Sequence, residues 1–139
     1  MTQRKELFIW IVTAVTVTLW AYRPIWNIDI FWHIATGRVI LESGIPETDI
    51  FAPPLIRGEW TPFQWGYEAL VAWIDDSFGL STLRWIHASI IGAAAGLFGL
   101  WSRERGATIL ASIASITIFI CLFEDRIRVR PHLFEPMFV

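Results

Sequence analysis

The chain has 139 residues, of which 55% are hydrophobic and 17% charged, and its mean hydropathy is +0.50. These values exclude a disordered chain and are too apolar for an ordinary soluble domain. The net charge of −2 provides no basic surface for nucleic acid. The single cysteine, Cys121, excludes an internal disulfide framework and a four-cysteine metal site. The composition therefore predicts a membrane protein.

The first apolar run covers residues 7–22 and contains no charged residue. Arg4 and Lys5 precede it, and aromatic side chains at its far end can extend it toward the ~30 Å thickness of a hydrocarbon core. No small-x-small cleavage site of a signal peptide follows it. We therefore predict an uncleaved transmembrane helix over residues 7–23, with the N-terminus in the cytoplasm.

Residues 24–79 contain five of the seven prolines and eight of the thirteen acidic residues. Such a segment cannot cross a bilayer, because its charges and its interrupted backbone would be unsatisfied there. It contains two amphipathic stretches, one from Phe31 to the Ser43-Gly44 pair and one from Phe63 to the Asp75-Asp76 pair. Both are too short to span and suit the membrane interface. The residues between them, 46–60, are typical of an ordered, turn-rich loop.

Two further apolar runs predict transmembrane helices over residues 80–101 and 106–123, joined by a turn short enough to make them antiparallel neighbours. Small residues on one face of the first of these would let another helix approach closely: Ala88, Gly92, Gly96 and Gly99. We expect this face to contact another protein or the helix at 106–123.

The predicted fold is thus an all-α membrane protein with three transmembrane helices and an outer loop that carries two interfacial (juxtamembrane) helices. Residues 1–139 are expected to form a single membrane-embedded unit, in which residues 124–139 are a surface tail.

Three groups of polar residues could carry chemistry. Asp29 and His33 are four residues apart, so on a helix they share a face and could hold a divalent cation or act as an acid–base pair. The alternative is a helix-capping aspartate beside a solvated histidine. Three alternating arginines suit the phosphate oxygens of a lipid headgroup or lipid pyrophosphate, or general anchoring at the membrane surface: Arg126, Arg128 and Arg130.

His87 is the third candidate, as an imidazole inside an apolar run. It could bind the metal of a haem or chlorophyll, or donate a hydrogen bond between helices. Apart from a pigment or haem at His87, or a divalent metal if the chain is an enzyme, no cofactor is expected.

Three segments carry a family resemblance. They read Asn27-Ile-Asp-Ile-Phe-Trp-His-Ile-Ala-Thr-Gly-Arg, Ser43-Gly-Ile-Pro-Glu-Thr-Asp-Ile-Phe and Gly58-Glu-Trp-Thr-Pro-Phe-Gln-Trp. In this order they resemble bacterial polytopic proteins of the C-type glycosyltransferase superfamily, in the branch that uses dolichyl- or undecaprenyl-phosphate sugars. The resemblance implies one opening helix, an outer loop with two juxtamembrane helices, and a long series of further spans.

In that family an Asp-x-Asp-like pair at the start of the loop serves catalysis and, in some members, metal binding. Asn27 stands at the first position here, so the resemblance leaves Asp29 as the one anionic candidate if the chain is active. The three predicted spans are also fewer than the family's series.

We therefore expect a non-catalytic integral membrane subunit derived from such a protein, packed within a larger complex such as a respiratory or photosynthetic assembly. The alternative is the N-terminal portion of a lipid-linked sugar glycosyltransferase that acts with further transmembrane spans. The expected partners are membrane lipids and other integral membrane subunits, with no nucleic acid. The expected location is the bacterial inner membrane, multi-pass, with residues 24–79 in the periplasm.

Overall fold

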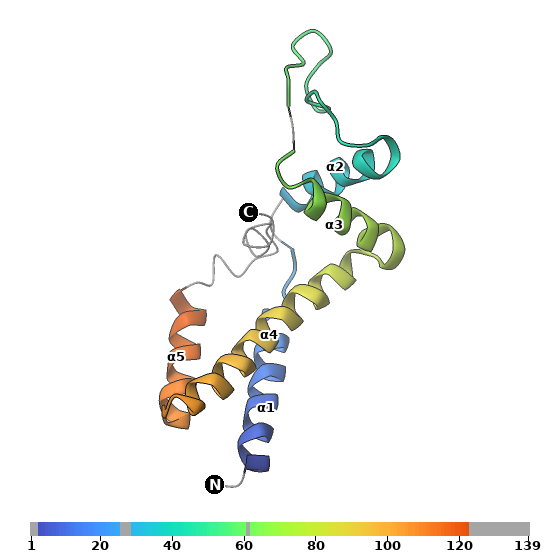
Figure 1. Cartoon of the computed structure of the whole chain (residues 1–139). Helices are drawn as coiled ribbons and strands as arrows, with labels where there is room; N and C mark the ends of the chain where they lie inside the picture. The colour runs from blue at the N-terminus through green and yellow to red at the C-terminus, as the bar shows by residue number, and fades with distance from the viewer. Residues whose placement is uncertain (1–2, 26–28, 61, 123–139) are drawn as a thin grey trace. The chain divides into compact units, whose positions relative to one another are not determined.

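In the computed structural model, residues 3–25, 29–60 and 62–122 are described. They form five helices and no strand (Figure 1). The helices are α1 (Gln3–Ala21), α2 (Asp29–Ser43), α3 (Trp65–Phe78), α4 (Leu80–Glu104) and α5 (Ile109–Leu122). Their contacts form two compact units. Unit 1 contains α1, α5 and α4 from Arg84 onward; unit 2 contains α2, α3 and the loop between them.

Unit 1 is built around an antiparallel contact between α1 and α4. The pairs of residues that meet follow one another at intervals of one turn along α1 and of one or two turns along α4, and the last pair lies just beyond α1: Glu6 with Arg103, Trp10 with Gly99, Ala14 with Gly96, Thr18 with Gly92, and Tyr22 with Trp85. We call this row of pairs the α1–α4 seam. Trp10 is 1% exposed and, with Val17 and Ile116 of α5, forms the hydrophobic core of the unit.

Glycine makes the α1–α4 seam possible because the two backbones approach too closely for a side chain. A Cβ atom built at Gly92 would lie 1.9 Å from Thr18 Oγ1 and 2.5 Å from the backbone oxygen of Ala14. One built at Gly99 would lie 2.2 Å from the ring of Trp10. The sequence correctly indicated a face for close helix packing, but its expected partner was another protein or the segment 106–123. The structure places α1 there instead.

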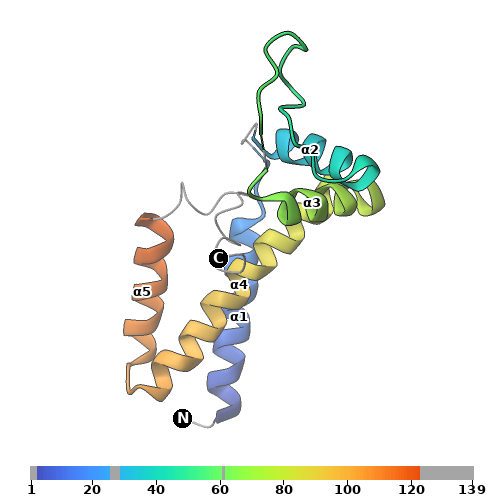
Figure 2. The same ribbon diagram turned by 45° about the horizontal axis from the view of Figure 1, so that its top comes forward.

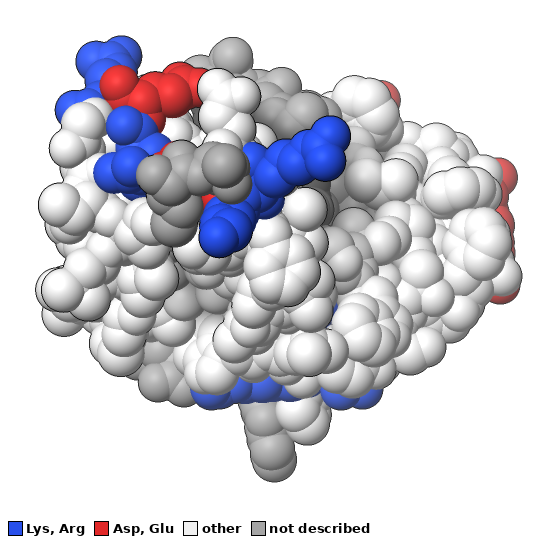
Figure 3. Space-filling model, turned by 90° about the horizontal axis from the view of Figure 1, so that it is seen from below, with Lys and Arg blue, Asp and Glu red and all other residues white. Residues whose placement is uncertain are grey.

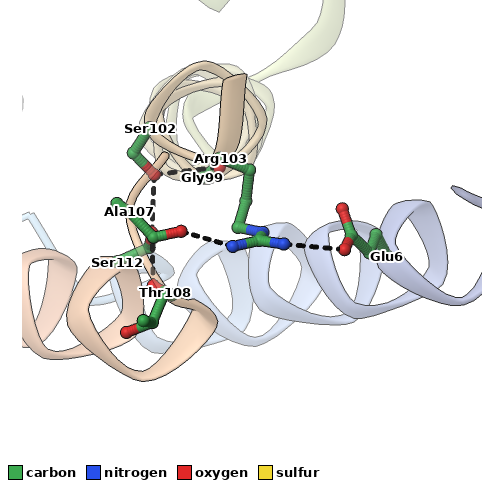
Figure 4. Close-up of polar contacts among 7 residues, drawn as sticks. All are labelled: Glu6, Gly99, Ser102, Arg103, Ala107, Thr108 and Ser112. Atoms are coloured by element: carbon green, nitrogen blue, oxygen red, sulfur yellow. Dashed lines mark hydrogen bonds and ion pairs between the residues drawn. The ribbon is translucent and has the colours of Figure 1, made fainter. Parts of the chain in front are cut away.

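Polar contacts join all three helices of unit 1 at the end where α1 begins and α4 ends (Figure 4). Arg103 donates to Glu6 Oε1 of α1 at 2.9 Å and to the backbone oxygen of Ala107, just before α5. The hydroxyl groups of Ser102 and Ser112 lie 2.6 Å apart, and both residues are buried. Between α4 and α5, Gly106 adopts a φ of 87°, a left-handed conformation that glycine takes without a steric penalty.

In unit 2, α2 and α3 lie side by side (Figures 1 and 2). His33 contacts Glu68, and Arg38 further along α2 contacts Asp75 and Asp76 further along α3, so the two helices run in the same direction. A parallel pair needs a connection that returns over the ~22 Å length of α2. Residues 44–64 provide it.

The returning segment is ordered, as the sequence predicted. Thr48 and Glu59 form an antiparallel bridge, and Trp60 N–H donates to Glu47 O at 3.0 Å. The side chain of Asp49 accepts a hydrogen bond from Phe51 N–H at 2.9 Å, which fixes the turn beyond the bridge.

One predicted helix boundary is wrong. The amphipathic stretch that starts at Phe63 was expected to end at the Asp75-Asp76 pair, but α3 continues to Phe78. Both carboxylates accept hydrogen bonds from Arg38, so they are neutralised on the helix rather than ending it. Gly79, with a φ of 82°, ends α3 and donates its N–H to Asp75 O.

Among the described residues, α4 alone is long and apolar enough to cross a membrane by itself. The helix α1 has 19 residues but includes three charged ones, and α5 has 14 described residues. Elsewhere the two helices contain no charged residue. The structure thus gives an all-helical chain with one helix of spanning length, and the predicted tail at 124–139 lies outside the described residues.

We expect Gly92→Ala to lower the free energy of unfolding by roughly 1–3 kcal/mol, because the new methyl group forces the backbones of α1 and α4 apart. Gly96→Ala is the matched control: its Cβ would lie 3.1 Å from Ala14 Cβ and 3.2 Å from Trp10 O, contacts that small shifts relieve. Both changes gain the same helix propensity. Thermal unfolding of the full chain in mild detergent, followed by tryptophan fluorescence, measures the difference. Equal stability of the two variants would contradict the seam.

Candidate functional site

The strongest polar constellation lies inside unit 2, where a buried histidine meets a buried glutamate. His33 Nδ1 of α2 lies 3.0 Å from Glu68 Oε1 of α3, and the two side chains are 10% and 6% exposed. With Glu68 ionised, its oxygen can only accept, so Nδ1 donates the hydrogen bond. Nε2 is then the ring nitrogen that remains for a ligand or a proton.

Helical spacing explains why these two groups meet. In α2 the buried residues Ile30, Ile34 and Gly37 form one stripe with His33, at intervals of three and four residues. In α3 Glu68 shares the buried stripe with Val71 and Ala72. His33 and Glu68 thus each lie on the buried face of their own helix, and they form a hydrogen bond when the two faces pack.

Close backbone packing holds the pair in place. A Cβ atom on Gly37 would lie 1.9 Å from the backbone oxygen of Glu68, so α2 touches α3 one turn beyond His33. The ring of Tyr67 stands edge-on to the imidazole of His33, with 5.6 Å between ring centroids. Burial, and secondarily the negative charge of Glu68, raises the pKa of Tyr67 well above its ordinary value.

The second carboxylate oxygen of Glu68, Oε2, is buried and has no hydrogen-bond partner among the described residues. The site can therefore accept one further donor or a proton. Within the same part of the chain, no three His, Cys, Asp or Glu residues are placed to hold a metal ion together.

An ion-pair cluster reinforces α2 against α3 at the surface. Arg38 donates to Asp75 Oδ2 at 2.9 Å and to Asp76 Oδ1 at 2.7 Å. The hydrogen bond to Asp76 raises the pKa of Arg38. Because the guanidinium group is 48% exposed, solvent screens these pairs and their main effect is on geometry.

An aromatic cluster ties the loop 44–64 to α2. The ring of Trp32 is nearly parallel to that of Trp60 at 6.2 Å and tilted against Phe51 at 5.4 Å. Trp32 and Phe51 are each 46% exposed. The cluster therefore presents a partly open aromatic surface beside the buried His33–Glu68 pair.

The residues predicted from sequence are placed as follows. Asp29 is the first residue of α2 and is exposed, whereas His33 is buried and pairs with Glu68 rather than standing on a solvent-facing surface. His87 and Ala88 are buried in α4, at 7% and 0% exposure. A pigment or haem ligand at His87 stays a prediction. Asn27 and the arginines at 126, 128 and 130 lie outside the described residues.

Sequence reasoning did not single out Glu68 or Arg38. For Glu68 a signal exists, since an acid three and four residues before Val71 and Ala72 lies on the apolar face of its own helix. An acid at such a position requires a buried partner. For Arg38 no local signal exists, because its partners are 37 and 38 residues away in sequence.

Comparison of the chain with protein-family models, with curated proteins and with solved structures finds no match in any of the three.

We expect the full chain to lose more stability from His33→Leu than from Glu68→Leu. The first variant leaves a carboxyl group buried without its partner, at a cost of about 3–5 kcal/mol. The second leaves an imidazole whose lost hydrogen bond costs about 1–3 kcal/mol. The double variant should cost less than the sum of the two. Denaturant unfolding followed by near-UV circular dichroism measures all three, and additive costs would show that the pair is not coupled.

Proposed function

We propose that this protein is an integral membrane subunit with a structural role, derived from a C-type glycosyltransferase-like protein. Its three-helix unit 1 is embedded in the bilayer and packs within a larger membrane complex. Unit 2 is the folded form of the outer loop. Membrane lipids and other integral membrane subunits are its proposed partners.

The packing of unit 1 supports insertion of α1 and α5 together with α4. The α1–α4 seam extends over almost the whole of α1, and Ile116 of α5 belongs to the same core. When a helix of spanning length inserts into the bilayer, helices packed this tightly against it insert as well. Large apolar side chains cover the outside of the unit, including Phe8, Leu19, Leu97 and Leu110, each more than 60% exposed. Such side chains suit contact with lipid tails or with other membrane helices.

The observation that carries a structural role is that three groups of polar side chains capable of acid–base or binding chemistry join one helix to another. His33 and Glu68 join α2 to α3, Arg38 does the same through Asp75 and Asp76, and Arg103 joins α4 to α1. Catalysis needs such groups directed at a substrate. Here the groups contact one another across helix pairs, which supports a role in packing.

For the location we propose the bacterial inner membrane, with the N-terminus in the cytoplasm. Arg4 and Lys5 at the start of α1 and Arg103 and Arg105 at the end of α4 belong to the same end of unit 1. The positive-inside rule favours that end on the cytoplasmic side. Unit 2 then lies in the periplasm.

We expect a photo-crosslinking side chain at Ile118 of α5 to form an adduct with another membrane polypeptide in native membranes, because Ile118 is 59% exposed. The same side chain at Ile116, which is 7% exposed, is the matched control and should react within the chain. Mass spectrometry of the adducts identifies the partner. Adducts with lipid alone at Ile118, Leu110 and Leu19 would contradict a role within a complex.

The second candidate function is the N-terminal portion of a lipid-linked sugar glycosyltransferase. The observation in its favour is Asp29, which is exposed at the first turn of α2. The same helix is fixed one turn later by the His33–Glu68 pair. A carboxylate held on a rigid element is what a general base or a metal ligand requires.

If the structural role holds, the purified chain should not release polyprenyl phosphate from a polyprenyl-phosphate sugar, with or without Mg²⁺ or Mn²⁺. The wild-type chain and the Asp29→Ala variant should give the same background in a radiolabelled-donor assay. Turnover by the wild-type chain that Asp29→Ala abolishes and Asp49→Ala preserves would establish the glycosyltransferase instead.

A further inference from the structure

The fold brings together two basic segments that lie far apart in sequence. Glu6 and Arg103, 97 residues apart, form an ion pair at 2.9 Å. This pair places Arg4 and Lys5, at the start of α1, at the same end of unit 1 as Arg105, just beyond the end of α4. Seen from the end where α1 begins and α4 ends, several basic side chains gather in one area of the face, with acidic side chains among them (Figure 3).

The acidic side chains at this end neutralise that charge only in part. Glu6 is engaged by Arg103, and Glu104 is the only other acid within residues 3–6 and 103–105. No carboxylate in the described parts of the chain forms an ion pair with Arg4, Lys5 or Arg105, and all three are exposed. We call these three residues the basic end.

An aromatic ring accompanies the basic end. The guanidinium group of Arg105 lies 5.3 Å from the ring centroid of Trp101, which is 51% exposed. A tryptophan at the end of a spanning helix favours the headgroup level of a bilayer. An arginine stacked on it is directed to the same depth, where phosphate groups are concentrated.

We infer that the basic end binds the phosphate groups of anionic phospholipids in one leaflet of the membrane. The charge is complementary, and the guanidinium and ammonium groups donate directly to phosphate oxygens. The last turn of α4, the helix long enough to cross a bilayer, brings the site to the headgroup level. The inference rests on the proposed insertion of unit 1, and it adds a preference for lipid class that insertion alone does not require.

Native mass spectrometry of the full chain in mild detergent tests this, with phosphatidylglycerol or phosphatidylcholine added at equal concentration. The wild type should retain phosphatidylglycerol in preference to phosphatidylcholine. Arg105→Gln should lower that preference about fivefold, and the triple change Arg4→Gln, Lys5→Gln and Arg105→Gln should abolish it. Arg57→Gln, which removes the same charge from an exposed loop position of unit 2, should leave it unchanged.

Three results would overturn the inference. They are an unchanged preference in the triple variant, an equal loss in Arg57→Gln, and displacement of phosphatidylglycerol by inorganic phosphate at the same concentration, which would assign the site to a free anion.

A separate arm tests insertion: Glu104→Cys and Glu59→Cys, each in a Cys121→Ser background, should react with an impermeant thiol reagent from opposite sides of sealed vesicles. Labelling from one side would refute the proposed topology. Labelling from opposite sides by a wild-type chain that shows no preference for phosphatidylglycerol would refute the basic end and leave the topology intact.

Discussion

The close contact between α1 and α4 is the constraint on which the rest of unit 1 depends. Gly92 and Gly99 remove the side chains that would keep the helices apart, and Trp10 and Thr18 fill the space from the other side. Once the two helices are this close, Glu6 reaches Arg103. Nη1 of Arg103 then donates a hydrogen bond to Ala107 O, and this bond orients the start of α5. The contact between α1 and α4 therefore positions three helices and brings together the charged side chains at the end where α1 begins and α4 ends.

In unit 2 the helices are held in position by other kinds of contact. Its helices run in parallel, so no short turn can join them, and their contact must be specified by side chains far apart in sequence. A buried pair, His33 with Glu68, matches the two apolar stripes, because any slip of one helix along the other would leave both groups unpaired. Gly37 sets the distance between the backbones, and Arg38 fixes the far end. The aromatic contacts of Trp32 then attach the returning loop.

The sequence allowed every helix to be predicted to within a few residues, because apolar runs, Gly-containing turns and charge clusters are local signals. The partners of those helices were not predictable in the same way. A row of small residues at Gly92 and Gly96 shows that something approaches closely, but several apolar helices could fit, and α1 has no residue that marks it as the partner. The Asp75-Asp76 pair was misjudged as a helix end for a related reason, since its neutralising Arg38 is on another helix. Among the site residues, His33 was identified and its partner Glu68 was not.

The two units differ in the environment that their surfaces require. This difference affects how the sequence of such a chain would change in evolution. Unit 2 is held by buried apolar residues and by the buried His33–Glu68 pair, none of which includes Asp29, so it can retain its fold whether or not Asp29 serves a reaction. The outside of unit 1 carries many exposed large apolar side chains, which the proposed insertion would cover with lipid or other helices. A chain that lost catalysis would therefore lose little stability in unit 2. The α1–α4 seam and its charged end would remain under selection for as long as the chain had to hold its place among other membrane helices.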